Sequence, residues 1–162
     1  MAGAGSKQAH GRDESEEERL DRNLMELLQE LRVALPGIQV LFAFLLVVPF
    51  QQGWEQVTEF EKTVYYATLL STAAASICLI APTARHRIRF HELDKKWIVD
   101  TANRLAIVGL GLLGLAISGV ILLISHVVYG DATTAIATAA VFASIIWVWF
   151  LAPLVRELRE DD

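Results

Sequence analysis

The stretch LAIVGLGLLGLAISGVILLISHVVY, residues 105–129, decides the fold class. It contains 25 consecutive residues without an Asp, Glu, Lys or Arg. An α-helix needs roughly 20 apolar residues to cross a hydrocarbon core about 30 Å thick. Three more runs lack these charged residues, at 33–50, 64–84 and 132–155, and they hold 18, 21 and 24 residues. The sequence therefore predicts an all-α integral membrane protein with four spans.

The remaining sequence is strongly charged. Although 54% of the 162 residues are hydrophobic, the chain carries 14 Lys and Arg against 19 Asp and Glu, a formal net charge of −5. A protein that binds nucleic acid is expected to show a basic footprint. The acidic balance therefore argues against nucleic acid as a partner.

The spans divide the chain into four predicted regions. Residues 1–18 are rich in Gly, Ser and Glu, with little apolar surface to offset the entropy of ordering, and predict a disordered acidic tail. Residues 19–32 predict an amphipathic helix that lies on an interface or a partner and leads into the first span. Residues 33–155 predict a four-helix membrane bundle, and residues 156–162 a C-terminal tail. The leucines that recur at helical spacing in the amphipathic segment are Leu20, Leu24, Leu27, Leu28 and Leu31.

The positive charges predict the orientation in the membrane. Thirteen of the 14 Lys and Arg lie before the first span, between the second and third, or after the fourth, and Lys62 is the exception. Cytoplasmic loops carry such an excess, so both termini and the loop after residue 84 are expected to be cytoplasmic, as is the amphipathic helix. The basic residues of this loop are also expected to hold anionic lipid headgroups, each adding about 1 kcal/mol. They are Arg85, Arg87, Arg89, Lys95, Lys96 and Arg104.

Small residues recur along the third and fourth spans and predict close helix packing. Such residues let helix backbones approach closely, which favours association in lipid. Packing within a single bundle is the simpler arrangement, and packing in a homo-oligomer or against a membrane-protein partner is the other. The residues are Gly109, Gly111, Gly114, Gly119, Ala135, Ala139 and Ala143.

Motifs for catalysis or metal binding are absent from the sequence, which contains neither HExxH nor a P-loop. His86 and His91 are five residues apart, a spacing that places them on different sides of a helix. His126 is expected most of a bilayer thickness away from His86. The single Cys78 falls within the second span and is expected to behave as a small apolar residue. We therefore expect a non-enzymatic protein with no catalytic residues, no metal site and no cofactor.

Three segments carry a resemblance to a known family. RNLMELLQELRVALPGIQVLFAFLLVVPFQ (22–51), VYYATLLSTAAASICLIAPTARHRIRF (64–90) and NRLAIVGLGLLGLAISGVILL (103–123) look like a family of small bacterial, largely actinobacterial, four-span membrane proteins of unknown function. The resemblance covers most of residues 19–155 and implies a location in the bacterial inner membrane. Some members carry an automatic sodium:proton antiporter label. The resemblance implies no catalytic or binding residues.

Two functions fit these observations. Ion–proton exchange generally needs an ionisable group inside the membrane, and the four runs contain none of the charged residues, which argues against an antiporter. The preferred function is that of an accessory or scaffold protein, whose cytoplasmic face contacts lipid or a partner. The alternative is an oligomeric channel or small ion transporter, with a pore shared between subunits and lined by Gln39, Gln51 and Gln52.

Overall fold

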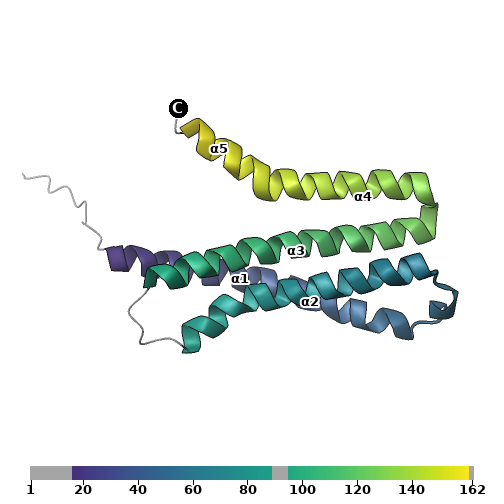
Figure 1. The fold of residues 1–162 in the computed structure, drawn as a ribbon, viewed down its shortest axis with the longest axis horizontal. Helices are drawn as coiled ribbons and strands as arrows, with labels where there is room; N and C mark the ends of the chain where they lie inside the picture. Colours follow the sequence, from purple (N-terminus) through teal and green to yellow (C-terminus); the bar gives the residue numbers. More distant parts are fainter. Residues whose placement is uncertain (1–15, 89–94, 161–162) are drawn as a thin grey trace, which may run out of the picture.

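The structure is a computed structural model that describes residues 16–88 and 95–160. In these residues all regular secondary structure is helical (Figure 1). Most of the predicted acidic tail, the middle of the basic loop and the last two residues lie outside this range. The elements are α1 Glu16–Val47, the 3-10 turns η1 Val48–Phe50 and η2 Trp54–Gln56, α2 Glu59–Ile88, α3 Lys95–Tyr129, α4 Asp131–Ile146, the π-helical segment η3 Trp147–Leu151, and α5 Ala152–Glu160.

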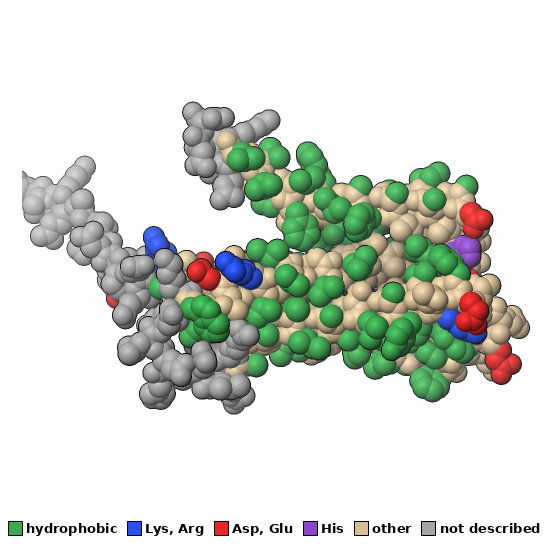
Figure 2. All heavy atoms as spheres, in the orientation of Figure 1, with side chains coloured by type: hydrophobic (Ala, Val, Ile, Leu, Met, Phe, Trp, Pro, Cys, Tyr) green, Lys and Arg blue, Asp and Glu red, His purple; other side chains and the backbone are tan. Residues whose placement is uncertain are grey.

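Four stretches of the described chain are long and apolar enough to cross a membrane, and they indicate a multi-pass membrane protein. They are Glu18–Phe50, Glu59–Ala84, Trp97–Tyr129 and Asp131–Arg156. Figure 2 shows that the coloured charged side chains gather at the two ends of the molecule, with apolar and uncharged surface between them. We call the end that carries residues 51–58 and Gly130 the loop end. The opposite end, where α1 and α3 begin, is the termini end.

The first three helices pack through regularly spaced seams. In α1 the buried residues fall every seven positions, at Leu24, Leu31, Ile38 and Leu45. In α2 they alternate in steps of three and four residues, a spacing typical of helices that pack side by side at a small crossing angle. These α2 residues are Tyr65, Thr68, Thr72, Ala75, Leu79 and Pro82. Leu31 and Ile38 of α1, Leu79 of α2 and Ala106 of α3 form the core cluster, so the three helices make one group.

Within the described chain, α3 is the central helix. It contacts α1, α2 and α4, whereas α4 contacts neither α1 nor α2. This arrangement differs from the predicted four-helix bundle, because the fourth helix lies on the flank of a three-helix group. The physical reason is that α3 carries small residues on two faces, so that it accepts a close neighbour on each.

The segment predicted as a separate amphipathic helix is the beginning of α1. This helix starts at Glu16, so residues 16–18 are helical where the tail was expected. Leu24 and Leu31 are buried, and Leu20, Leu27 and Leu28 are half-buried. The chain itself therefore covers the apolar face that the sequence assigned to an interface or a partner.

The predicted fourth span is interrupted near its end. The α-helical part stops at Ile146, five π-helical residues follow, and α5 continues to Glu160 through most of the predicted C-terminal tail. Pro153 accounts for the interruption, since it has no N–H for the carbonyl of Trp149 and its ring clashes with that carbonyl. Figure 1 shows α5 turned away from the axis of α4. In the described structure, α5 contacts no element other than the π-helical segment.

Candidate functional site

The basic residues predicted to bind lipid are only partly described. Arg85 and Arg87 belong to the last turn of α2, and Lys95 and Lys96 begin α3, so the backbone brings these four to the termini end. Arg89 lies outside the described residues. Arg104 of α3 is the one whose side chain is described, and it is exposed.

Three of the four glycines of α3 lie where another helix leaves no room for a side chain. A Cβ on Gly109 would lie 2.6 Å from Leu79 Cγ of α2. One on Gly114 would lie 2.8 Å from Ile145 Cγ2 of α4, and one on Gly119 would overlap Oγ1 of Thr68 of α2. For Gly111 the nearest atom is Phe150 Cζ at 4.0 Å, an ordinary contact. Gly109 and Gly119 thus allow α3 to approach α2, and Gly114 allows it to approach α4.

The alanines of α4 lie on a different surface. Ala135, Ala139 and Ala143 are all exposed, so they do not pack against another helix of the same chain. The face of α4 that meets α3 carries Thr134 and Ile145 instead. The alanine face is therefore open in the single chain.

Three buried hydroxyl groups of α2 and α3 bond to their own helices. Thr68 Oγ1 donates to the carbonyl of Val64 at 2.8 Å, and Thr72 Oγ1 donates to the carbonyl of Thr68 at 2.8 Å. Ser118 Oγ donates to the carbonyl of Gly114 at 2.9 Å. These hydroxyls are satisfied locally and do not connect into a polar path across the three-helix group.

The three glutamines predicted to line a pore lie in two different places. Gln39 is exposed on α1 within the uncharged run, and its side chain makes no hydrogen bond to the described residues. Gln51 and Gln52 lie at the loop end, roughly 15–20 Å farther along the helix axis at 1.5 Å per residue. There they line a groove.

This groove is a concave feature at the loop end of the molecule. It has a volume of about 690 Å³ and an almost entirely apolar lining. Leu41, Phe44 and Leu45 of α1 with Val48 of η1 form one wall. Residues between 120 and 128 of α3 form the opposite wall, and the segment 51–57 closes the loop end. Tyr65 and Glu61 contribute from α2.

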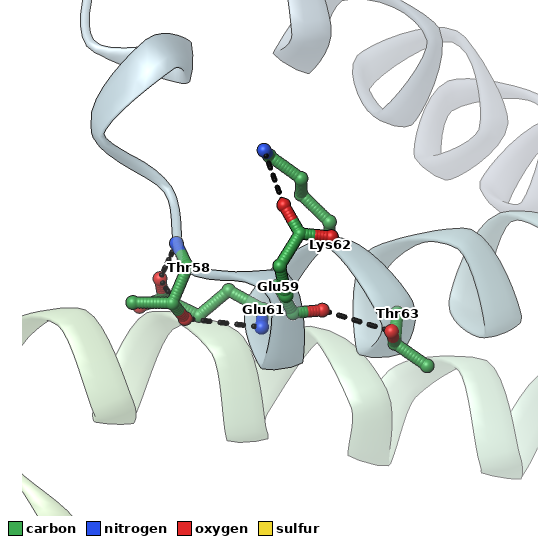
Figure 3. A network of polar contacts seen from close by, with 5 residues as sticks. All are labelled: Thr58, Glu59, Glu61, Lys62 and Thr63. Atoms are coloured by element: carbon green, nitrogen blue, oxygen red, sulfur yellow. Dashed lines mark hydrogen bonds and ion pairs between the residues drawn. The ribbon is translucent and has the colours of Figure 1, made fainter.

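Hydrogen bonds fix the loop end of the groove. Thr58 and Glu61 form a capping box at the start of α2: the Thr58 N–H and Oγ1 donate to Glu61 Oε2 at 2.8 and 2.7 Å, and the Glu61 N–H donates to Thr58 Oγ1 at 3.3 Å (Figure 3). The Tyr65 hydroxyl donates to the carbonyl of Leu45 at 2.8 Å, which ties α2 to the end of α1. Trp54 packs edge-to-face on the Tyr65 ring, with centroids 5.0 Å apart.

A second polar contact joins α3 to α4 at the same end. His126 Nδ1 lies 3.4 Å from Asp131 Oδ1, and the imidazole packs edge-to-face against Phe60 with centroids 5.7 Å apart. Among the described residues, no three His, Cys, Asp or Glu side chains converge as a metal site would require. The histidine therefore links the ends of α2, α3 and α4.

A comparison with protein families matches residues 13–153 of the chain. The chain belongs to the DUF6328 family, a family of unknown function. The match begins three residues before α1 and ends at Pro153. It therefore includes the first three candidate spans completely and most of the fourth. Searches of the curated proteins and of the solved structures found no match to this DUF6328 member.

The groove of this DUF6328 member was not predicted from the sequence. Its walls are ordinary apolar residues of two spans, and nothing in their spacing shows that the loop ends of α1 and α3 stand apart. The signal that could have indicated it is the cluster of Gln51, Gln52 and Trp54 directly after the first span. The two glutamines, which the sequence analysis predicts to line a shared pore, lie at one end of the groove.

Proposed function

We propose that this protein is a non-enzymatic accessory protein of the bacterial inner membrane that binds anionic lipid headgroups at its termini end. The observation that carries the proposal is the position of α5. Leu154, Val155 and Leu158 are 51%, 40% and 62% exposed. Because α5 leaves the axis of α4 and contacts only the π-helical segment, these residues pack against none of the helices α1 to α4.

An amphipathic helix of this kind is expected to lie in the plane of a membrane surface. Its apolar side chains enter the boundary between headgroups and acyl chains, and its charged side chains face the water. Arg156 is exposed on α5. In the sequence, 13 of the 14 Lys and Arg come before the first span, between the second and the third, or after the fourth. Such an excess of positive charge favours a cytoplasmic location and attraction to the anionic inner leaflet. In the proposal, α5 and the basic loop both bind this leaflet.

The test compares two faces of α5 in lipid nanodiscs. In a Cys78→Ala background, a bimane label is attached to Leu158→Cys, or to Arg156→Cys, which lies about 200° around the helix at 100° per residue. With phosphatidylglycerol, the label at 158 should emit as in an apolar environment and the label at 156 as in water. The shift at 158 should be smaller with phosphatidylcholine and should weaken with salt. A label at 158 that stays in water in anionic nanodiscs would contradict the proposal.

A second candidate, an oligomeric channel, is favoured by Gln39. Its primary amide lies exposed on α1 between apolar residues, and burying an unpaired amide in hydrocarbon costs several kcal/mol, roughly 2–7 by transfer measurements. A neighbouring subunit or a shared water-filled pore would remove this cost. Native mass spectrometry gives the number of subunits, and ion flux into liposomes tests conduction. If a ring of subunits conducts and Gln39→Leu leaves the current unchanged, Gln39 does not line the pore.

A further inference from the structure

We propose that the groove at the loop end binds one phospholipid with a primary-amine headgroup, which places a hydrocarbon chain between α1 and α3. The volume of about 690 Å³ falls within the range of roughly 300–1,000 Å³ that is usual for small-molecule sites. The site lies at the opposite end of the molecule from α5 and the basic loop. It is therefore independent of the function proposed above.

The position and lining of the groove favour a hydrocarbon chain as the occupant. Its walls belong to membrane-spanning stretches, and Phe44 of α1 with Ile124 and Val127 of α3 are exposed along its rim. The groove therefore opens sideways, where the surrounding medium is lipid tails. An empty apolar space loses dispersion contacts, and water does not fill a space without polar partners. A lipid chain fills the space, restores the dispersion contacts and needs no polar partner.

The polar groups are confined to one end of the groove, as the layout of a lipid requires. Gln51, Gln52 and Trp54 line that end and carry side-chain N–H donors, which suit phosphate and ester oxygens. Glu61 lines the same end, and the capping hydrogen bonds from Thr58 all go to its Oε2. Oε1 can then accept a hydrogen bond from the headgroup.

The charges at the loop end select the type of headgroup. Glu61 is the charged residue among those that line the groove. Nearby, Glu55 is exposed, and Lys62 Nζ is paired with Glu59 Oε1 at 2.9 Å. An anionic headgroup would meet an excess of negative charge here. An ammonium group would be attracted and could donate to Oε1, whereas the methylated nitrogen of choline has no N–H to donate.

The first experiment measures which lipid the full chain retains. The protein is reconstituted with equal amounts of phosphatidylethanolamine, phosphatidylcholine and phosphatidylglycerol of matched chains, and retained lipids are counted by native mass spectrometry. We expect one tightly held phosphatidylethanolamine per chain. Val120→Phe fills the groove and should remove this lipid, whereas Val108→Phe, exposed on the same helix outside the groove, should not. Circular dichroism checks that both variants are folded.

The second variant tests the headgroup without filling the groove. Glu61→Gln removes the charge but keeps the capping box, because Gln satisfies the same motif. The preference for phosphatidylethanolamine over phosphatidylcholine should fall about fivefold, the size expected for a partly exposed charge-assisted contact, with the number of bound lipids unchanged. An unchanged preference would overturn the headgroup assignment. If Val120→Phe retained as much lipid as the wild type, the groove would not be the lipid site. If Val120→Phe instead lost a second copy of the chain that the wild type binds, the groove would be an interface between subunits, and the lipid site would be overturned.

Discussion

Replacing Gly109 by alanine tests the close packing of α2 and α3. The added Cβ would lie 2.6 Å from Leu79 Cγ, whereas two carbon atoms pack best at about 3.5–4.0 Å. Leu79 is 0% exposed, and the Cβ of Cys78 lies 3.3 Å from the same point, so the neighbouring helix has little room to adjust. Overpacking of this kind costs about 1–3 kcal/mol. The higher helix propensity of alanine returns about 1 kcal/mol.

Gly111 is the matched control, because it lies on the same helix and its added Cβ would meet only Phe150 Cζ at 4.0 Å. Gly111→Ala should gain the propensity without the clash, which makes Gly109→Ala the less stable variant by about 1–3 kcal/mol. Unfolding of the purified protein by SDS titration from mild micelles, followed by circular dichroism, measures the difference. If Gly109→Ala were as stable as Gly111→Ala, the close approach of the two helices would be wrong.

Three further substitutions test other contacts. Tyr65→Phe removes the hydrogen bond to the carbonyl of Leu45 and should lower the free energy of unfolding by about 1–2 kcal/mol in the same SDS titration. Thr58→Ala removes its hydroxyl from the capping box with Glu61, which should cost about 1 kcal/mol and appear as faster amide exchange in the first turn of α2. Leu31→Ala should lower the free energy of unfolding by about 2–4 kcal/mol in the titration, because Leu31 belongs to the core. A change near zero would mean that Leu31 lies on the surface.

The candidate spans were predictable because a hydrocarbon core sets a minimum length for an uncharged helix. Runs without charged residues gave all four in the correct order. The leucine spacing around Leu24 and Leu31 also indicated an apolar face. Spacing shows that a face exists but does not show what covers it, and in this chain the other helices cover it.

The placement of α4 and the groove could not be read from the sequence for a related reason. The glycines of α3 show that a neighbour comes close, but only the three-dimensional arrangement assigns Gly109 to α2 and Gly114 to α4. Ala135 and Ala139 are also small residues at helical spacing, yet both are exposed. The sequence therefore predicted the four helices, but it did not predict that α4 contacts only α3 among the other three.

The flank position of α4 has a consequence for the biosynthesis of the protein. Since α4 contacts α3 and neither α1 nor α2, it adds nothing to the contacts that join the first three helices. Those helices leave the ribosome before α4 does, so they can pack on one another while α4 is still being translated. The contacts that join these three helices therefore involve only residues that are translated before Asp131, where α4 begins.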